Sequence, residues 1–165
     1  PFLIKEKGYF FDAITWDGKQ GLVLSDPAGP FYGLIRISEK GRSYKLLNPA
    51  EHPALQKGEA AFAASNSNIV IKGNDTWLVS GGKKARVFYS SDKAKTWKVV
   101  ETPIVQGKTM TGIFTADFYD AKHGFIAGGD YDLPNKKDVD KCIITKDAVE
   151  KNSEPIFIKS DVKSA

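Results

Sequence analysis

Three segments of the chain resemble one another at a spacing of about 50 residues, and this repetition limits the fold more than any other feature. The middle copy runs from Ser90 to Trp97 and carries Asp92 as its third residue. The acidic residue of the first copy, Glu39, precedes Asp92 by 53 residues, and that of the third copy, Asp147, follows it by 55. The sequence therefore predicts three structurally equivalent units.

A second series of similar segments supports the same period. The segment that begins at Asp17 recurs 103 residues later at Asp120, which is about two spacings away. Between them, the segment from Asn74 to Val79 fills the place of the middle copy. We expect units over residues 9–50, 51–103 and 104–152, with residues 153–165 starting a further, incomplete unit.

Apolar residues occur in short clusters that are typical of β-strands. The clusters are rich in Val, Ile, Phe and Tyr and are separated by Gly, Pro, Asn and Asp. Only the stretch from Pro53 to Ala64 resembles a helix, and Pro53 and Gly58 argue against one. The pattern predicts an all-β fold with about four strands in each unit, which is the construction of β-propeller blades.

Composition excludes several classes of protein. Hydrophobic residues make up 41% and aromatic residues 12% of the chain, so it is expected to fold. The net charge of +4 is spread along the sequence, and no nucleic-acid binding is expected. No stretch approaches the roughly 18 consecutive apolar residues that span a bilayer, so no membrane insertion is expected. Cys142 is the single cysteine, so neither an internal disulfide nor a multi-thiolate metal site is possible. The sequence also has no Asp-x-Asp-x-Asp-Gly loop and no Gly-x-Gly-x-x-Gly motif after a strand, so we expect neither a metal nor a cofactor.

The segment from Ser90 to Trp97 resembles the Asp box, or bacterial neuraminidase (BNR) repeat, of sialidase-like propellers. That motif reads Ser/Thr-x-Asp-x-Gly-x-Thr-Trp; Ser90, Asp92, Thr96 and Trp97 match it, and Ala94 replaces the glycine. A short acid and a hydroxyl can accept backbone N–H groups within a tight turn, and a tryptophan can pack between sheets. We therefore expect these residues to be structural and Asp92 not to be catalytic.

Other segments resemble a bacterial family of exported propellers related to photosystem II stability and assembly factors, some of which are labelled oxidoreductase. These segments include Phe11 to Ile14, Gly58 to Ser65, and Gly128 to Tyr131. The resemblance implies a periplasmic, outer-membrane-associated or secreted protein. Because a propeller needs about four to eight blades, three blades imply part of a larger propeller or a homodimer that closes a six-bladed ring. The first alternative is favoured.

The antiparallel connectivity of such blades predicts where functional residues gather. Alternate turns lie at opposite ends of a sheet, so one end is expected to hold the Asp boxes together with the turn at Asp17. The opposite end then collects six polar residues that form the best candidate site. Asp12, Asp26 and Asp130 are the candidate catalytic residues, and Glu59, Arg86 and Tyr131 are the candidate ligand-binding residues. The alternative is that these acids only bind backbone amides in loops.

Two functions of different classes remain open at this point. The first is a non-enzymatic binding or assembly module that takes a protein segment or a glycan at this end. The second is a glycoside hydrolase of the sialidase-like or xyloglucanase-like type, which would use two of the carboxylates as acid and base. Arg86 is the only arginine expected there, which weakens a sialidase because that chemistry favours a cluster of guanidinium groups. A third hypothesis, an oxidoreductase, depends on the family label alone.

Overall fold

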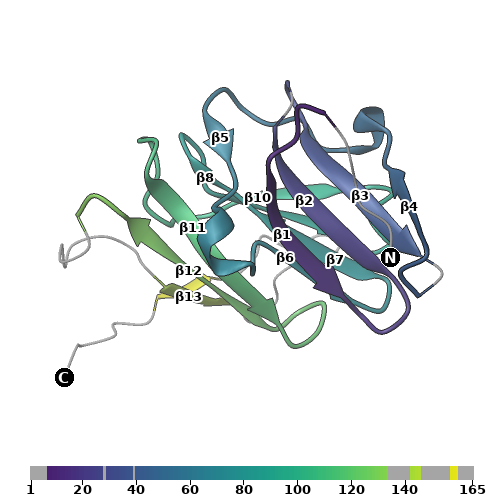
Figure 1. Cartoon of the computed structure of the whole chain (residues 1–165). Helices are drawn as coiled ribbons and strands as arrows, with labels where there is room; N and C mark the ends of the chain where they lie inside the picture. The colour runs from purple at the N-terminus through teal and green to yellow at the C-terminus, as the bar shows by residue number, and fades with distance from the viewer. Residues whose placement is uncertain (1–6, 28, 39, 134–141, 146–156, 160–165) are drawn as a thin grey trace.

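The computed structural model describes residues 7–27, 29–38, 40–133, 142–145 and 157–159, and this part of the chain is all-β (Figure 1). Its helical segments are two single turns, η1 (Pro49–Glu51) and η2 (Ala63–Ser65). None of the helices described is long and apolar enough to cross a membrane. The strands are β1 (Phe11–Trp16), β2 (Gly21–Pro27), β3 (Tyr32–Ser38), β4 (Ser43–Leu46), β5 (Glu59–Ala60), β6 (Ile69–Lys72), β7 (Asp75–Val79), β8 (Gly81–Gly82), β9 (Arg86–Ser90), β10 (Lys98–Glu101), β11 (Thr111–Phe118), β12 (Gly124–Asp130), β13 (Cys142–Thr145) and β14 (Phe157–Lys159).

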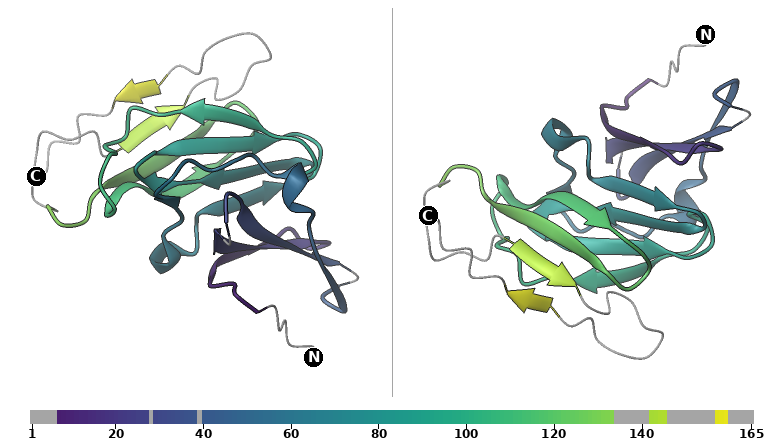
Figure 2. Two further views of the ribbon diagram at one scale, coloured as in Figure 1. Left: turned by 90° about the horizontal axis from the view of Figure 1, so that it is seen from above. Right: turned by 90° about the horizontal axis from the view of Figure 1, so that it is seen from below.

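The strands form three antiparallel sheets, which confirms the predicted all-β class. The first sheet has the order β1-β2-β3-β4, the second β6-β7-β9-β10 and the third β11-β12-β13-β14. The short strands β8 and β5 extend the third sheet through one pairing of Gly81 with Gly112. A Cβ at Gly112, whose φ is +132°, would lie 2.2 Å from the Cα of Gly81, so this junction requires glycine. In the described residues the sheets form an open stack and do not close into a ring (Figure 2).

Residues 153–165 are predicted to begin a further, incomplete unit, and the structure describes only part of this stretch. The described part of this stretch, β14, pairs antiparallel with β13 and becomes the outermost strand of the third sheet. The physical reason is that β13 otherwise presents an unpaired edge, and a short strand that follows in sequence satisfies it. Beyond Thr145, the third copy of the box lies outside the described residues.

Two apolar clusters hold the three sheets together. Between the first and second sheets, side chains such as Leu24, Leu34 and Phe88 are fully buried. Between the second and third sheets, the rings of Trp77 and Phe118 stack with centroids 4.5 Å apart and an interplanar angle of 5°. Each such buried side chain contributes about 1.5–3 kcal/mol of hydrophobic free energy. Face-to-face packing of this kind is typical of stacked antiparallel sheets.

The residues after η2 connect the first strands of all three sheets. Strands β1 and β11 both contact β6. The backbone N–H of Ile14 on β1 donates to Asn66 Oδ1 at 2.9 Å, and the backbone N–H of Ala116 on β11 donates to the carbonyl of Ser67 at 3.0 Å. This short connection therefore binds one backbone N–H group on β1 and one on β11.

The Asp box forms the turn between β9 and β10, and its bonds are made within the turn. Asp92 Oδ1 accepts the Ser90 hydroxyl at 2.8 Å and the backbone N–H groups of Lys95 and Thr96 at 3.0 and 2.9 Å. Asp92 Oδ2 accepts the Thr96 hydroxyl at 2.6 Å. The bonds from Thr96 hold the pKa of Asp92 well below its usual range. Ala94 adopts a left-handed φ of 58°, the conformation that the motif's glycine would supply.

The box lies at the same end of the molecule as the first turn of the first sheet, as predicted. The Arg36 guanidinium donates to Gln20 Oε1 at 2.9 Å and to the carbonyl of Lys93, so it joins the two turns. The turns at Asp17 and Asp120 are equivalent as well, because each carboxylate accepts two backbone N–H groups of its own turn. The repeat spacing therefore corresponds to repeated local structure.

Replacing Asp92 with alanine is expected to destabilise the fold. The turn loses four hydrogen bonds to the carboxylate, so the free energy of unfolding should fall by about 1–2 kcal/mol at pH 7. Urea denaturation of Asp92→Ala and of the exposed control Lys95→Ala measures this. Equal stability of the two variants would show that the carboxylate does not hold the turn.

Candidate functional site

A cluster of polar side chains lies between the first two sheets, at the end opposite the Asp box. It consists of Asp12 on β1, Asp26 on β2, Tyr32 on β3, Glu59 on β5 and Arg86 on β9, and we call it the polar cluster. Asp26 is half-buried and the other four side chains are buried. Four of the six predicted site residues are thus brought into one place, and Tyr32 joins them.

Two β-bulges position the aspartates. In the pairing of β1 with β2, the register passes from Phe11 to Ala13 and leaves Asp12 without a partner residue. In the pairing of β2 with β3, it passes from Ser25 to Pro27 and leaves Asp26 unpaired in the same way. In a regular strand the side chains alternate between the two faces of the sheet, and a bulge changes the direction of the extra residue's side chain. Bulges are common beside functional sites. The two bulges lie on neighbouring strands and direct both carboxyls into the polar cluster.

Burial and mutual repulsion make both aspartates easier to protonate. Burial, followed by the charge of Asp26, raises the pKa of Asp12 from 3.8 to about 7, although a hydrogen bond from the Asp26 backbone opposes the change. Burial also raises the pKa of Asp26, against a hydrogen bond from the backbone of Ala61. A carboxyl that titrates near neutral pH can donate or accept a proton under physiological conditions.

Several buried oxygens in the polar cluster have no partner among the described residues. They are Asp12 Oδ2, Asp26 Oδ1 and the hydroxyl of Tyr32. Tyr32 is only 2% exposed. Burial, and then the charges of Glu59 and the two aspartates, raise its pKa well above the usual value, so the hydroxyl keeps its proton. Buried polar groups without partners are rare in folded proteins, so these three oxygens need a structural or functional explanation.

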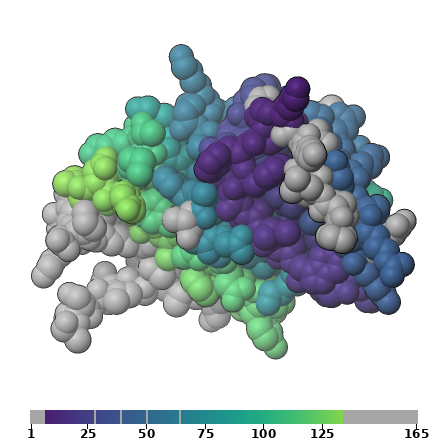
Figure 3. Space-filling view, viewed as in Figure 1, coloured from purple at the N-terminus to yellow at the C-terminus, as the bar shows by residue number. Residues whose placement is uncertain are grey.

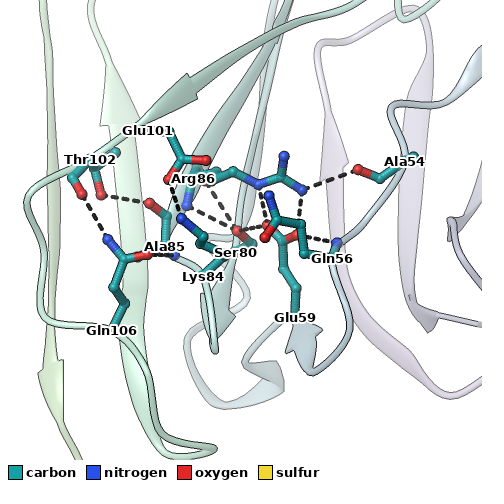
Figure 4. Close-up of polar contacts among 10 residues, drawn as sticks. All are labelled: Ala54, Gln56, Glu59, Ser80, Lys84, Ala85, Arg86, Glu101, Thr102 and Gln106. Atoms are coloured by element: carbon teal, nitrogen blue, oxygen red, sulfur yellow. Dashed lines mark hydrogen bonds and ion pairs between the residues drawn. The ribbon is translucent and has the colours of Figure 1, made fainter.

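Glu59 and Arg86 bind each other and form the fixed part of the polar cluster (Figure 4). The Arg86 guanidinium donates from Nε to Glu59 Oε1 at 2.8 Å and from Nη2 to Glu59 Oε2. The Ser80 hydroxyl donates to Glu59 Oε1 at 2.5 Å, and the backbone N–H of Gln56 donates to Glu59 Oε2 at 2.8 Å. Arg86 also reaches the carbonyl of Ala54 at 3.1 Å. This pair ties the loop before β5 to the second sheet.

Asp130 and Tyr131 lie apart from the polar cluster, at the end of β12 in the third sheet. Asp130 pairs with Lys108 at 3.3 Å and accepts the backbone N–H of Asp132 at 3.1 Å. Tyr131 is 68% exposed. These two predicted residues therefore do not share a site with Asp12, and the tyrosine of the polar cluster is Tyr32.

Tyr32 and its neighbour His52 are the residues that sequence reasoning missed. His52 is buried, its Nδ1 lies 2.9 Å from the carbonyl of Tyr32, and burial lowers its pKa. Tyr32 begins a strand whose alternate residue, Leu34, is a core residue. That alternation was the available signal for placing the tyrosine inward, beside the expected acids.

Within the described residues, no group of three or more His, Cys, Asp or Glu side chains is arranged to hold a metal ion. Comparisons of the chain with known family models, with curated proteins and with solved structures gave no match. The geometry of the polar cluster and of the surface around it is therefore the basis for the function considered below.

The Glu59–Arg86 pair is expected to contribute strongly to stability. Arg86→Met leaves a buried, uncompensated carboxylate and should lower the free energy of unfolding by about 3–5 kcal/mol. Lys84→Met is the matched control, because it removes the cation of the exposed Lys84–Glu101 pair and should cost less than about 1 kcal/mol. Chemical denaturation distinguishes the two cases. A similar decrease in the free energy of unfolding for both variants would show that the buried pair contributes no more to stability than the exposed one.

Proposed function

We propose that the protein is a non-enzymatic binding or assembly module, an Asp-box propeller of the exported type that takes a protein segment or a glycan at the end opposite its box. The repeated sheets, the turn at Asp92 and the stacking of successive sheets support the architecture. The exposed aromatic side chains at the opposite end support a binding surface, and they carry the proposal.

Phe10 and Phe11 lie beside the polar cluster at the start of β1, and Tyr131 lies at the same end of the third sheet, apart from the cluster. Phe10 is 64% exposed and Phe11 39%, immediately before Asp12. Tyr131 is exposed where β12 ends, beside the start of β11. The segment that leads into β1 lies at the surface of the molecule (Figure 3). Exposed aromatic rings can anchor either a peptide side chain or the face of a sugar.

The polar cluster supports this surface from below. Glu59 and Arg86 satisfy each other and hold the loop before β5 on the second sheet. Their carboxylate and guanidinium are less than one-tenth exposed, so they position the surrounding backbone and do not form the outer contact layer. A rigid scaffold beneath exposed aromatic groups lowers the entropy lost when a ligand binds.

Two exposed tyrosines of the third sheet offer a matched test of this surface. Tyr131 lies at the proposed binding end, and Tyr119, which is 83% exposed, lies in the turn between β11 and β12 at the other end. The whole chain is screened against an immobilised glycan array and a displayed peptide library. For a ligand selected in this way, we expect Tyr131→Ser and Phe10→Ser to weaken binding at least about tenfold, since aromatic anchors contribute 2 kcal/mol or more.

Tyr119→Ser should bind that ligand as the wild type does. An equal loss of affinity in Tyr131→Ser and Tyr119→Ser would contradict the placement of the binding surface. Unchanged affinity in Tyr131→Ser and Phe10→Ser would contradict it as well. Circular dichroism of each variant confirms that the fold is intact.

One observation favours glycoside hydrolysis as a second candidate function. A carboxyl whose pKa lies near 7 next to a second carboxyl is the arrangement that a general acid requires, and Asp12 and Asp26 provide it. On this hypothesis Asp12→Asn abolishes release of the aglycone from aryl glycosides. A binding module shows no such release in either the wild type or the variant.

A further inference from the structure

We propose that Asp12 and Asp26 share one proton at neutral pH and form a proton-sensitive pair beneath the binding end of the molecule. This inference does not depend on the identity of the ligand. It concerns the two bulged positions, their buried oxygens and the charges that face them.

The two bulges lie on adjacent strands, with Asp12 one position further into the sheet than Phe11 and Asp26 one position beyond Ser25, the residue that pairs with Phe11. The backbone N–H of Asp26 donates to the carbonyl of Phe10 at 2.9 Å, which ties the end of β2 to the start of β1. Asp12 Oδ2 and Asp26 Oδ1 are both buried, and neither has a hydrogen-bond partner in the described part of the chain. The Tyr32 hydroxyl shares both properties, and its electrostatic neighbours include both aspartates.

The charges that face the pair leave one negative charge without compensation. Glu59 from β5 and Arg86 from β9 neutralise each other through two hydrogen bonds. Tyr32 from β3 is neutral, because the pKa of its hydroxyl is raised, and His52 beside it is held neutral by burial. Two ionised carboxylates would then repel each other in a poorly solvated space, which is the condition that retains a proton.

A proton fits this site better than a larger occupant. The free oxygen atoms of the pair are almost inaccessible to solvent. The described residues also hold no set of three or more side chains suited to a metal ion. A proton on one carboxyl turns an acceptor into a donor, and that O–H can be accepted by the neighbouring carboxylate. Binding of the proton thus removes one of the two charges and supplies one donor to a group of buried acceptors.

Loss of the proton affects the surface above the pair. When both carboxyls are ionised, their repulsion acts on the bulged ends of β1 and β2, directly beside Phe10 and Phe11. The strand ends that carry the exposed aromatic side chains are therefore expected to be well ordered below neutral pH and less ordered above it. This coupling makes the binding end responsive to pH near neutrality.

Carboxyl carbon NMR of selectively labelled aspartate tests the proposal. In the wild type one of the two carboxyls should titrate near pH 7, and in Asp26→Asn the midpoint of Asp12 should fall by at least about one pH unit as the repulsion is removed. Midpoints below about pH 5 for both carboxyls in the wild type would overturn the proposal. An unchanged midpoint of Asp12 in Asp26→Asn would show that the two carboxyls do not share a proton.

The pH dependence of stability provides a second readout that needs no ligand. The folded state holds the proton of Asp12 more tightly than the unfolded chain, so wild-type stability should fall as pH rises from about 4 to about 7 and then level off. Asp12→Asn, which is close in shape, should lack this fall and melt at least about 3 °C above the wild type at pH 8. Asp117→Asn, at an exposed acid on β11, should keep the wild-type profile.

If stability depends on pH in the same way in the wild type and in Asp12→Asn, the proposal is overturned. A confirmed proton pair in a chain that binds no ligand on the arrays would instead contradict the proposed function alone. The two conclusions can therefore fail separately.

Discussion

The packing of each sheet on the next through apolar faces is the interaction on which the rest of the structure depends. A four-stranded sheet of this length has a small core of its own, and the fully buried residues lie mainly between sheets. The second sheet is central, because Trp77 faces the third sheet and Phe88 faces the first. The polar cluster lies at one margin of the first of these interfaces, so its geometry is set by the same packing.

The order of the strands could be predicted from sequence to a large extent. Short apolar clusters and punctuating turns predicted the all-β class, and the recurring turns at Asp17 and Asp120 have matching hydrogen bonds. The rule that alternate turns lie at opposite ends also grouped Asp12 and Asp26 with Glu59 and Arg86. These predictions succeeded because they depend only on local pattern and on chain reversal.

The details of the site could not be predicted in this way. A β-bulge inserts one residue without changing the apolar pattern visibly, so the inward direction of Asp12 and Asp26 has no signature in the sequence. Asp130 occupies the corresponding end of another sheet, but there it forms an ion pair with Lys108, which compensates its negative charge. Side-chain partners from other sheets decide such outcomes, and strand patterns do not reveal them.

The connection after η2 has a consequence for the behaviour of the molecule in solution. Asn66 and Ser67 occupy hydrogen-bonding groups at Ile14 and Ala116 that would otherwise face outward from the first strands. Unpaired strand edges are templates on which chains add to one another and aggregate. By binding these groups internally, η2 and the residues after it reduce the strand edge that is open to a second chain at β1 and β11.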